Sequence, residues 1–273
     1  MTRALEVSEI SKTIRYQVIQ MSKNGRAPHL GSSLSCVDLI VAAYHAFLRI
    51  NPTIPADPLR DRFILSKGHA VSTLYAMLAY KKFFPMKDLK SFNSDGSNLP
   101  EHPTPGCVPG IEMATGSFGH GLSVGIGMAL AARILKQSYR VMVLLSDGEC
   151  NEGSVWEAAM FSPSKKLDNL IAIVDFNKWQ ATERSEEVMA LSPLKDKWSA
   201  FGWETYEIDG HNIDEILDVY AKLANENGKP KAIIAHTVKG KGVSFMEDDN
   251  NWHYRIPNDD EFEKVKLEFG IIE

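Results

Sequence analysis

Two short stretches decide the fold: Leu144-Leu-Ser-Asp-Gly-Glu-Cys-Asn-Glu-Gly153 and Val174-Asp-Phe-Asn-Lys-Trp-Gln180. They overlap the ends of two apolar runs, 141–145 and 170–174, which are short and rich in β-branched residues, as buried strands are. The apolar segment 155–161 between them suits a crossover helix. The sequence therefore predicts a strand–helix–strand unit with two parallel strands.

Two oxygen donors follow these strands. Asp147 and Asn177 stand thirty residues apart, and the carboxyl ends of parallel strands form the edge where open α/β sheets bind ligands. Carboxylate and amide oxygens suit Mg²⁺ or Ca²⁺, and so few protein ligands leave positions for phosphate oxygens. Gly148 and Gly153 would let the backbone approach a phosphate closely. The alternative is that Asp-Gly forms only a turn and that Asn177 is a loop residue.

The remaining elements alternate in the manner of an α/β fold, a doubly wound parallel sheet with helices on both faces. Further strands are predicted at 62–65, 203–208 and 232–235, and helices at 5–23, 35–48, 70–82, 117–137, 194–201, 213–226 and from 258 onward. Ser35 and Asp38 look like a capping box. Residues 86–115, rich in Pro, Gly and Ser, predict a long functional loop.

The whole chain, 1–273, is expected to form one domain. It would have an N-terminal helical segment at 1–58 and a C-terminal helical tail at 256–273. The predicted 117–137 helix carries three glycines, Gly121, Gly125 and Gly127, which cost helix stability and so indicate close approach by a neighbouring helix or subunit.

Composition excludes several function classes. The chain is 44% apolar and 24% charged, with a net charge of −5, which gives no reason to expect a nucleic-acid partner. Its apolar stretches are interrupted by polar residues before the roughly 20 residues a membrane span needs. The three cysteines, Cys36, Cys107 and Cys150, are widely spaced, which favours reduced thiols in a cytoplasmic protein.

The eight histidines fall into two groups. His45 lies in an apolar helical pattern, His211 in turn chemistry, and His236 at a strand end, so structural roles are favoured for the first two. The others lie in Gly- or Pro-rich loops or at a helix start, where functional groups concentrate. These are His29, His69, His102, His120 and His253.

Several motifs together resemble the transketolase family. Asp-Gly-x-x-x-Glu-Gly at 147–153 with Asn177 looks like the thiamine diphosphate motif. Ser-Lys-Gly-His-Ala at 66–70, Leu-Pro-x-His-Pro at 99–103, Gly-Ile-Glu-x-x-Thr-Gly-Ser at 110–117 and Thr-Val-Lys-Gly-Lys-Gly-Val-Ser at 237–244 follow in the family's order. The resemblance runs from about residue 10 to about residue 255. It implies the diphosphate-binding (PP-type) domain of that fold.

The resemblance implies roles residue by residue. The catalytic groups would be His29, His69, His102 and His253. Thiamine diphosphate would be bound by His69, Gly116, Ser117, Phe118, Asp147, Gly148, Glu149, Glu152, Asn177, Lys239 and His253. Asp147, Asn177 and the Trp179 carbonyl would hold Mg²⁺, with Ca²⁺ or Mn²⁺ as alternatives. Histidines that titrate near neutral pH suit the proton transfers of ketose cleavage and aldehyde addition.

The resemblance also implies a partner. The family's second, pyrimidine-binding domain, with the Glu that activates the cofactor, has no counterpart here. We therefore expect an N-terminal subunit of a split transketolase, inactive alone, joining a C-terminal half in a heterotetramer and moving a two-carbon ketol unit between sugar-phosphate-type substrates. Alternatives are a subunit resembling 1-deoxyxylulose-5-phosphate synthase or a 2-oxo acid dehydrogenase, or a non-catalytic scaffold subunit.

Some positions depart from the family pattern. Ser146 replaces a usual Gly, His120 a usual Gln, and Phe118 a common Leu, while Pro28 precedes His29 where Gly is common. The segment 181–184, Ala-Thr-Glu-Arg, lacks a usual glycine, which predicts an altered loop beside the metal ligands. Such changes could fit a specialised donor or acceptor.

Overall fold

The computed structural model describes residues 2–271. Its centre is a five-stranded sheet in the order β1-β2-β3-β5-β4, in which every neighbouring pair is parallel. The strands are β1 (Arg62–Leu65), β2 (Val141–Ser146), β3 (Leu170–Phe176), β4 (Glu204–Asp209) and β5 (Lys231–His236). This confirms the predicted parallel α/β sheet. The predicted limits at residues 1 and 273, and position 272 of the predicted tail, lie outside the described residues.

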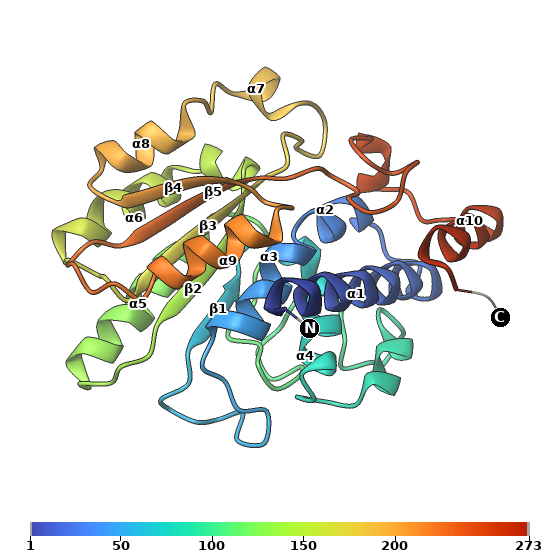
Figure 1. Ribbon diagram of the computed structural model, residues 1–273, viewed down its shortest axis with the longest axis horizontal. Helices are drawn as coiled ribbons and strands as arrows, with labels where there is room; N and C mark the ends of the chain where they lie inside the picture. Colours follow the sequence, from blue (N-terminus) through green and yellow to red (C-terminus); the bar gives the residue numbers. More distant parts are fainter. Residues whose placement is uncertain (1, 272–273) are drawn as a thin grey trace.

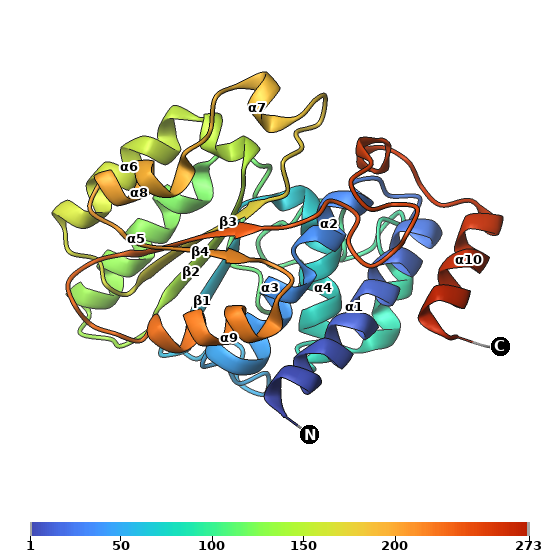
Figure 2. The same cartoon turned by 45° about the horizontal axis from the view of Figure 1, so that its top comes forward.

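Helices cover both faces of the sheet (Figures 1 and 2). One layer holds α1 (Arg3–Gly25), α3 (Val37–Ala42), α4 (Val71–Tyr80) and α9 (Ile213–Lys222), and the other holds α5 (His120–Ile134), α6 (Gly153–Ser164) and α8 (Leu194–Ala200). Strand side chains alternate between these layers, so Met142 and Leu144 join the first core while Val141 and Val143 join the second. Because both faces are covered, the strands read as continuous apolar runs.

The predicted helix over 35–48 is wrong in its bounds. The chain forms α2 (Leu30–Ser35), then α3 after Cys36, then a π-helical turn at Ala43–Phe47. The predicted capping box is also wrong, because Ser35 Oγ lies 2.6 Å from Asp175 Oδ2 as a donor. A buried carboxylate needs such donors, and this tertiary demand outweighs local capping.

Helix α5 begins later than predicted and approaches the sheet. Ser117 and Gly119 have φ of 61° and 71°, outside the helical region, so α5 starts at His120. A Cβ at Gly125 would lie 2.7 Å from Val143 Cγ2 of β2, and one at Gly121 would lie 2.5 Å from Ser66 Oγ. Gly127 meets nothing within 4 Å. The close neighbours of Gly121 and Gly125 are thus strand β2 and the end of β1, not a helix.

The remaining helical elements are short, apart from α10 (Asp259–Phe269). The others are α7 (Ser185–Val188) and 3₁₀ turns at Gly68–Ala70, Met86–Ser91, Gly148–Asn151 and Asn250–His253. A capping box of Asn258 and Glu261 starts α10, and Phe262 stacks on Tyr16 of α1 at 6.1 Å between ring centres. Among the described residues, no helix is long and apolar enough to cross a membrane.

Candidate active site

A cavity of about 330 Å³ opens at the carboxyl ends of β1, β2 and β3. It is lined by His29, Ser32, His69, His102, Gly116, Ser117, Ser146, Asp147, Gly148, Glu149, Glu152, Asn177, Trp179, Gln180, Ala181 and His253. The structure therefore brings together most residues of the predicted site. Phe118 and Lys239 do not line this cavity.

The predicted metal ligands lie side by side because of the register between β2 and β3. Ser146 is paired with Asp175, so Asp147 and Asn177 leave the sheet close together. Asp147 is buried, and its oxygens accept hydrogen bonds from Gly148 N at 2.9 Å, Lys178 N at 2.9 Å and Ser185 Oγ at 2.7 Å. Asn177 Oδ1 accepts from Trp179 N at 3.0 Å. Both oxygen donors are thus held by the backbone of one loop.

Burial shapes the electrostatics of Asp147. It raises the pKa of this carboxyl to about 6, opposed by the bond from Ser185 and reinforced by nearby Asp175. The nearby Lys67 instead pairs with Asp175. A buried carboxylate with no direct cationic partner among the described residues suits a bound divalent cation.

The loop after Asn177 closes without the family's glycine. Gln180 N donates to Glu183 O at 2.9 Å and Ser185 N to Lys178 O at 3.1 Å, forming a tight turn in which residues 181–184 all have negative φ. Glycine is therefore not required there. Arg184 stacks on Trp179 at 3.8 Å, and its two terminal nitrogens bond to Asp248 at 2.6 and 2.7 Å. Neither backbone bond of the turn uses the Trp179 carbonyl, the third predicted metal ligand.

Ser146 is accommodated by Glu149. It ends β2 in extended backbone, and its N–H donates to Glu149 Oε2 at 2.8 Å while its hydroxyl lies 3.3 Å from the same oxygen. The other oxygen, Oε1, accepts from Ser66 Oγ and from Gly119 N at 3.0 Å. Burial raises the pKa of Glu149. Glu149, predicted to bind the cofactor, thus ties β1, β2 and the start of α5 together within the cavity wall.

Four histidines form one wall of the cavity. The His29 ring lies 4.9 Å from that of His253, 5.5 Å from His69 and 5.9 Å from His102, centre to centre. The backbone N–H of His29 donates to His253 O at 2.7 Å, and His69 Nδ1 lies 2.6 Å from Ser117 Oγ. These rings come from four segments that are far apart in sequence, which only the fold brings together.

Burial and lysine charges keep two of these rings neutral. Burial lowers the pKa of His69 well below its usual value, and Lys67 lowers it further. Burial and then Lys239 lower the pKa of His253 to about 3. His253 Nδ1 lies 3.1 Å from Lys239 Nζ, so a neutral His253 accepts there and carries its proton on Nε2.

Lys239 is buried behind the histidine wall. Its ammonium donates to Asn250 Oδ1 at 2.6 Å as well as to His253, and burial lowers its pKa to about 8. In this structure it therefore positions His253, whereas the sequence predicted contact with the cofactor.

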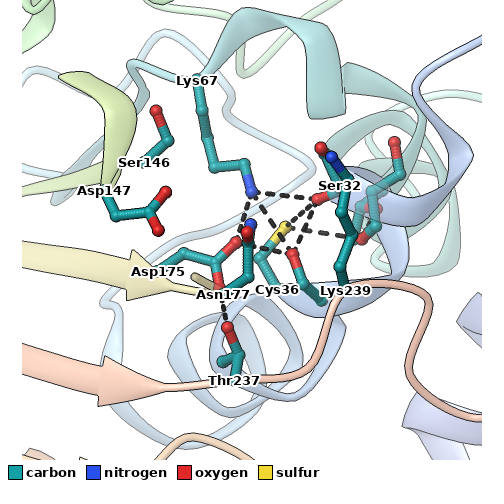
Figure 3. A network of polar contacts seen from close by, with 12 residues as sticks. Ser32, Cys36, Lys67, Ser146, Asp147, Asp175, Asn177, Thr237 and Lys239 are labelled. Atoms are coloured by element: carbon teal, nitrogen blue, oxygen red, sulfur yellow. Dashed lines mark hydrogen bonds and ion pairs between the residues drawn. The ribbon is translucent and has the colours of Figure 1, made fainter. Parts of the chain in front are cut away.

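A buried ion pair forms the floor beneath the cavity. Figure 3 shows Lys67 extending to Asp175 and to the Ser32 carbonyl, with Thr237 on the other side of Asp175. Both charged side chains have no exposed surface. Such a pair is structurally committed, because removing either partner leaves an uncompensated buried charge. It holds α2, β3 and the segment after β5 around the site.

The other predicted residues divide between two surfaces. Glu152 is exposed at the cavity rim. Phe118 is 63% exposed, and with Gly116 and His120 it lines an adjoining cavity of about 340 Å³. The histidines with favoured structural roles do pair internally: His45 Nε2 lies 3.0 Å from Glu6, and His211 Nδ1 2.9 Å from Asp38. His236 Nε2 lies 2.8 Å from Glu207.

Sequence reasoning missed Glu101, Ser32 and Ala181, and named Gln180 only as part of a motif. Glu101 Oε1 lies 2.9 Å from His29 Nδ1. Its only signal was its place before His102 in the Leu-Pro-x-His-Pro motif. Gln180 follows the metal loop, and its buried Nε2 has no hydrogen-bond partner among the described residues, which suits an acceptor on a bound ligand.

The site fits a cofactor-borne metal better than a metal held by the protein alone. In the described part of the chain, no cluster of three or more His, Cys, Asp or Glu side chains could hold a metal ion. Asp147, Asn177 and the Trp179 carbonyl would supply part of a coordination shell, leaving positions for diphosphate oxygens. A Cβ at Gly148 would meet only the Gln180 side chain, at 3.5 Å, so this chain leaves that backbone open to a ligand.

Comparisons with known proteins agree with this geometry. The family model described as the transketolase, thiamine diphosphate binding domain matches residues 7–272. One of the two named subunits of apulose-4-phosphate transketolase from Phocaeicola vulgatus is 42% identical over 258 residues, covering 94% of this chain and 92% of the relative. The 6-deoxy-6-sulfo-D-fructose transketolase subunit SqwG of a Clostridium species is 45% identical over 219 residues, 80% of each chain.

Solved structures show the same likeness. Transketolase from Campylobacter jejuni superposes with a TM-score of 0.90 and 28% identity over 99% of this chain, and transketolase from Leishmania mexicana with a TM-score of 0.90 and 26% identity. The chain covers 43% and 42% of those two chains. It therefore spans less than half the length of the solved transketolases that it matches.

Proposed function

This chain belongs to the transketolase family, as an N-terminal subunit of the split type, and from that premise we propose how its residues serve ketol transfer. We propose that, with a C-terminal partner, it transfers a two-carbon ketol unit from a ketose or ketose phosphate to an aldose acceptor. The observation that carries the proposal is one cavity in which Asp147 and Asn177 lie opposite four clustered histidines.

Asp147, Asn177 and the Trp179 carbonyl would hold Mg²⁺ against the diphosphate. Gly148 would let the backbone approach the phosphates, with Gly116 and Ser117 beside the cofactor and Glu152 at the rim. Thiamine diphosphate supplies the carbon nucleophile that a protein lacks. The chain's own contribution is anchoring and orientation, to which the three hydrogen bonds that fix Asp147 contribute.

The histidines would handle protons and substrate hydroxyls. His253, with its proton on Nε2, can donate to a carbonyl or hydroxyl oxygen, and Lys239 fixes that tautomer. His69 is oriented by Ser117. His29 and His102 would face the sugar, where a neutral imidazole can accept a hydroxyl proton during cleavage and return it during addition.

We propose assembly with a separately encoded C-terminal subunit into a heterotetramer. An apolar surface of this chain supports self-association: Phe118, Ile134, Leu135 and Met160 are 63%, 78%, 64% and 53% exposed, with Val124 and Phe161 also exposed. Apolar side chains clustered over α5 and α6 are typical of an interface. The chain's net charge of −5 gives no support for a nucleic-acid partner.

We further propose that residues 1–273 form one thiamine diphosphate-binding domain, acting in the cytoplasm. Cys36 and Cys150 are buried, Cys107 is half-buried, and all three are free thiols, as a reducing compartment would keep them.

Activity assays would test the function. The assembled pair should transfer a ketol unit from xylulose 5-phosphate to an aldose phosphate and should leave pyruvate unused. Release of carbon dioxide from pyruvate instead would favour a synthase or a 2-oxo acid dehydrogenase. Cofactor binding without any carbon–carbon chemistry, across ketose phosphates, sulfosugars and pyruvate, would favour a scaffold subunit. The wide ketose set is needed because related subunits are named for apulose 4-phosphate and sulfofructose.

A further inference from the structure

His29 is held rigidly from its backbone side. It has φ of 68°, an uncommon value for a residue other than glycine, and its N–H donates to His253 O at 2.7 Å. Its ring stands edge-on to His253, with interplanar angle 88°. The backbone position is thus fixed by the 250–253 turn, while the protonation state of the ring depends on what faces its nitrogens.

One carboxylate reaches that ring. Glu101 Oε1 lies 2.9 Å from His29 Nδ1, and this buried nitrogen has no linear hydrogen bond to any described residue. The other groups facing His29 are His69, His102, His253, Tyr254 and Lys239, which are imidazoles, a phenol and a cation. Glu101 is the acid among these neighbours. Its side chain is 29% exposed, so it lies at the cavity edge and not in the core.

We propose that Glu101 is a positioning residue for His29, holding the proton on Nδ1 so that the Nε2 lone pair accepts a hydroxyl proton from the sugar. This proposal rests on the proposed ketol transfer. A carboxylate beside one imidazole nitrogen fixes the tautomer and stabilises the imidazolium formed when the other nitrogen takes a proton, as in the serine-protease triad. The charge balances, because Nε2 gains the proton that the hydroxyl loses and releases it to the acceptor's new hydroxyl.

The titration of His29 follows the same geometry. Burial lowers the pKa of His29, Glu101 raises it, and His102 and Lys239 lower it again. Removing the Glu101 charge should therefore lower this pKa further. A weaker base would result, held in no single tautomer.

The test compares Glu101→Gln with Asp95→Asn, an exposed acid in the same loop, in the chain assembled with its partner. For Glu101→Gln we expect kcat to fall by about 10- to 100-fold, in the lower range of general-base effects, with the acid limb of the kcat/KM profile moved to lower pH. Imidazole ¹⁵N shifts of His29 should change from the Nδ1–H form toward a mixture. Asp95→Asn should match the wild type.

The outcomes separate two failures. If the wild-type pair transfers no ketol unit, the proposed function fails, whatever Glu101 does. If the wild-type pair is active but Glu101→Gln keeps its kcat, its acid limb and its His29 tautomer, the positioning role is refuted. A change in KM or stability alone, with the tautomer and pH profile unmoved, would also refute it, since that pattern belongs to a residue that only tethers the loop.

Discussion

At the scale of single residues, buried acids hold this chain together around its site. Asp38 accepts from the Arg15 guanidinium of α1 and lies 2.9 Å from His211 Nδ1, while the other ring nitrogen of His211 accepts from Val238 N at 2.9 Å. One carboxylate thus connects α1, α3 and the loops after β4 and β5. Burial acts to raise the pKa of Asp38, but Arg15 and His211 outweigh it and lower the pKa to about 2.

Asp38→Asn should destabilise the isolated chain by about 3 kcal/mol at pH 7, because Arg15 loses its buried partner. The folded-state pKa lies below the unfolded value, so the stabilisation by the charge is present above about pH 4 and is lost as pH falls through about 2. Urea unfolding should therefore show the gap between wild type and variant shrinking by about 2 kcal/mol from pH 5 to pH 2. A gap independent of pH, or one shared by the exposed Asp95→Asn, would contradict this.

At the scale of elements, glycines in α5 separate the demands of the sheet from those of the exposed face. Gly125 lies against β2 with no room for a methyl group, whereas Gly127 faces open space. The same helix therefore offers a close-packed site and its matched control.

Gly125→Ala should lower the free energy of unfolding by about 1–3 kcal/mol, the usual cost of overpacking. Gly127→Ala should raise it by about 0.5–1 kcal/mol, since alanine favours the helix. Chemical denaturation of the isolated chain measures both. Equal effects from the two substitutions would show that α5 does not pack on β2 as described.

The turn over 180–183 is a second element with its own device. Arg184 links Trp179 of the metal loop to Asp248, whose backbone N–H in turn donates to Lys239 O at 2.8 Å. The segments that carry the metal ligands and His253 are joined through one exposed side chain.

Arg184→Ala should leave global stability within about 1 kcal/mol of wild type, because exposed ion pairs contribute little. The Gln180 and Ser185 amides should nevertheless exchange with solvent several-fold faster, since the local opening is no longer restrained. Hydrogen-exchange mass spectrometry would detect the change, with Lys195→Ala as an exposed control on α8. Unchanged exchange in 178–186 would mean that the backbone turn alone holds the loop.

At the scale of the whole molecule, the sequence predicted the sheet well because parallel strands buried on both faces are continuous apolar runs. Asp147, Asn177 and the histidines could be placed in one site because strand ends meet at one edge and because the motifs kept family order. The contact between Glu101 and His29, the break at Cys36 and the retreat of Lys239 behind His253 depend on loop and tertiary geometry. Local pattern carries no signal for such contacts.

The same scale sets the division of labour between subunits. This chain provides the metal loop, the histidine wall and the exposed apolar surface over α5 and α6, whereas a partner would complete the cofactor site. Binding of the cofactor is therefore the property that joins every level, from the Asp147 carboxylate to the assembly.

The most direct measurement is calorimetric titration of thiamine diphosphate with Mg²⁺ into this chain with and without a C-terminal partner, repeated with Asp147→Ala. We expect tight binding only in the assembled pair and at least about a 100-fold loss in the variant, because a metal ligand is removed. Circular dichroism should confirm that the variant folds and assembles. Failure of the wild-type pair to bind the cofactor, or unchanged affinity in a folded Asp147→Ala pair, would contradict the central claim.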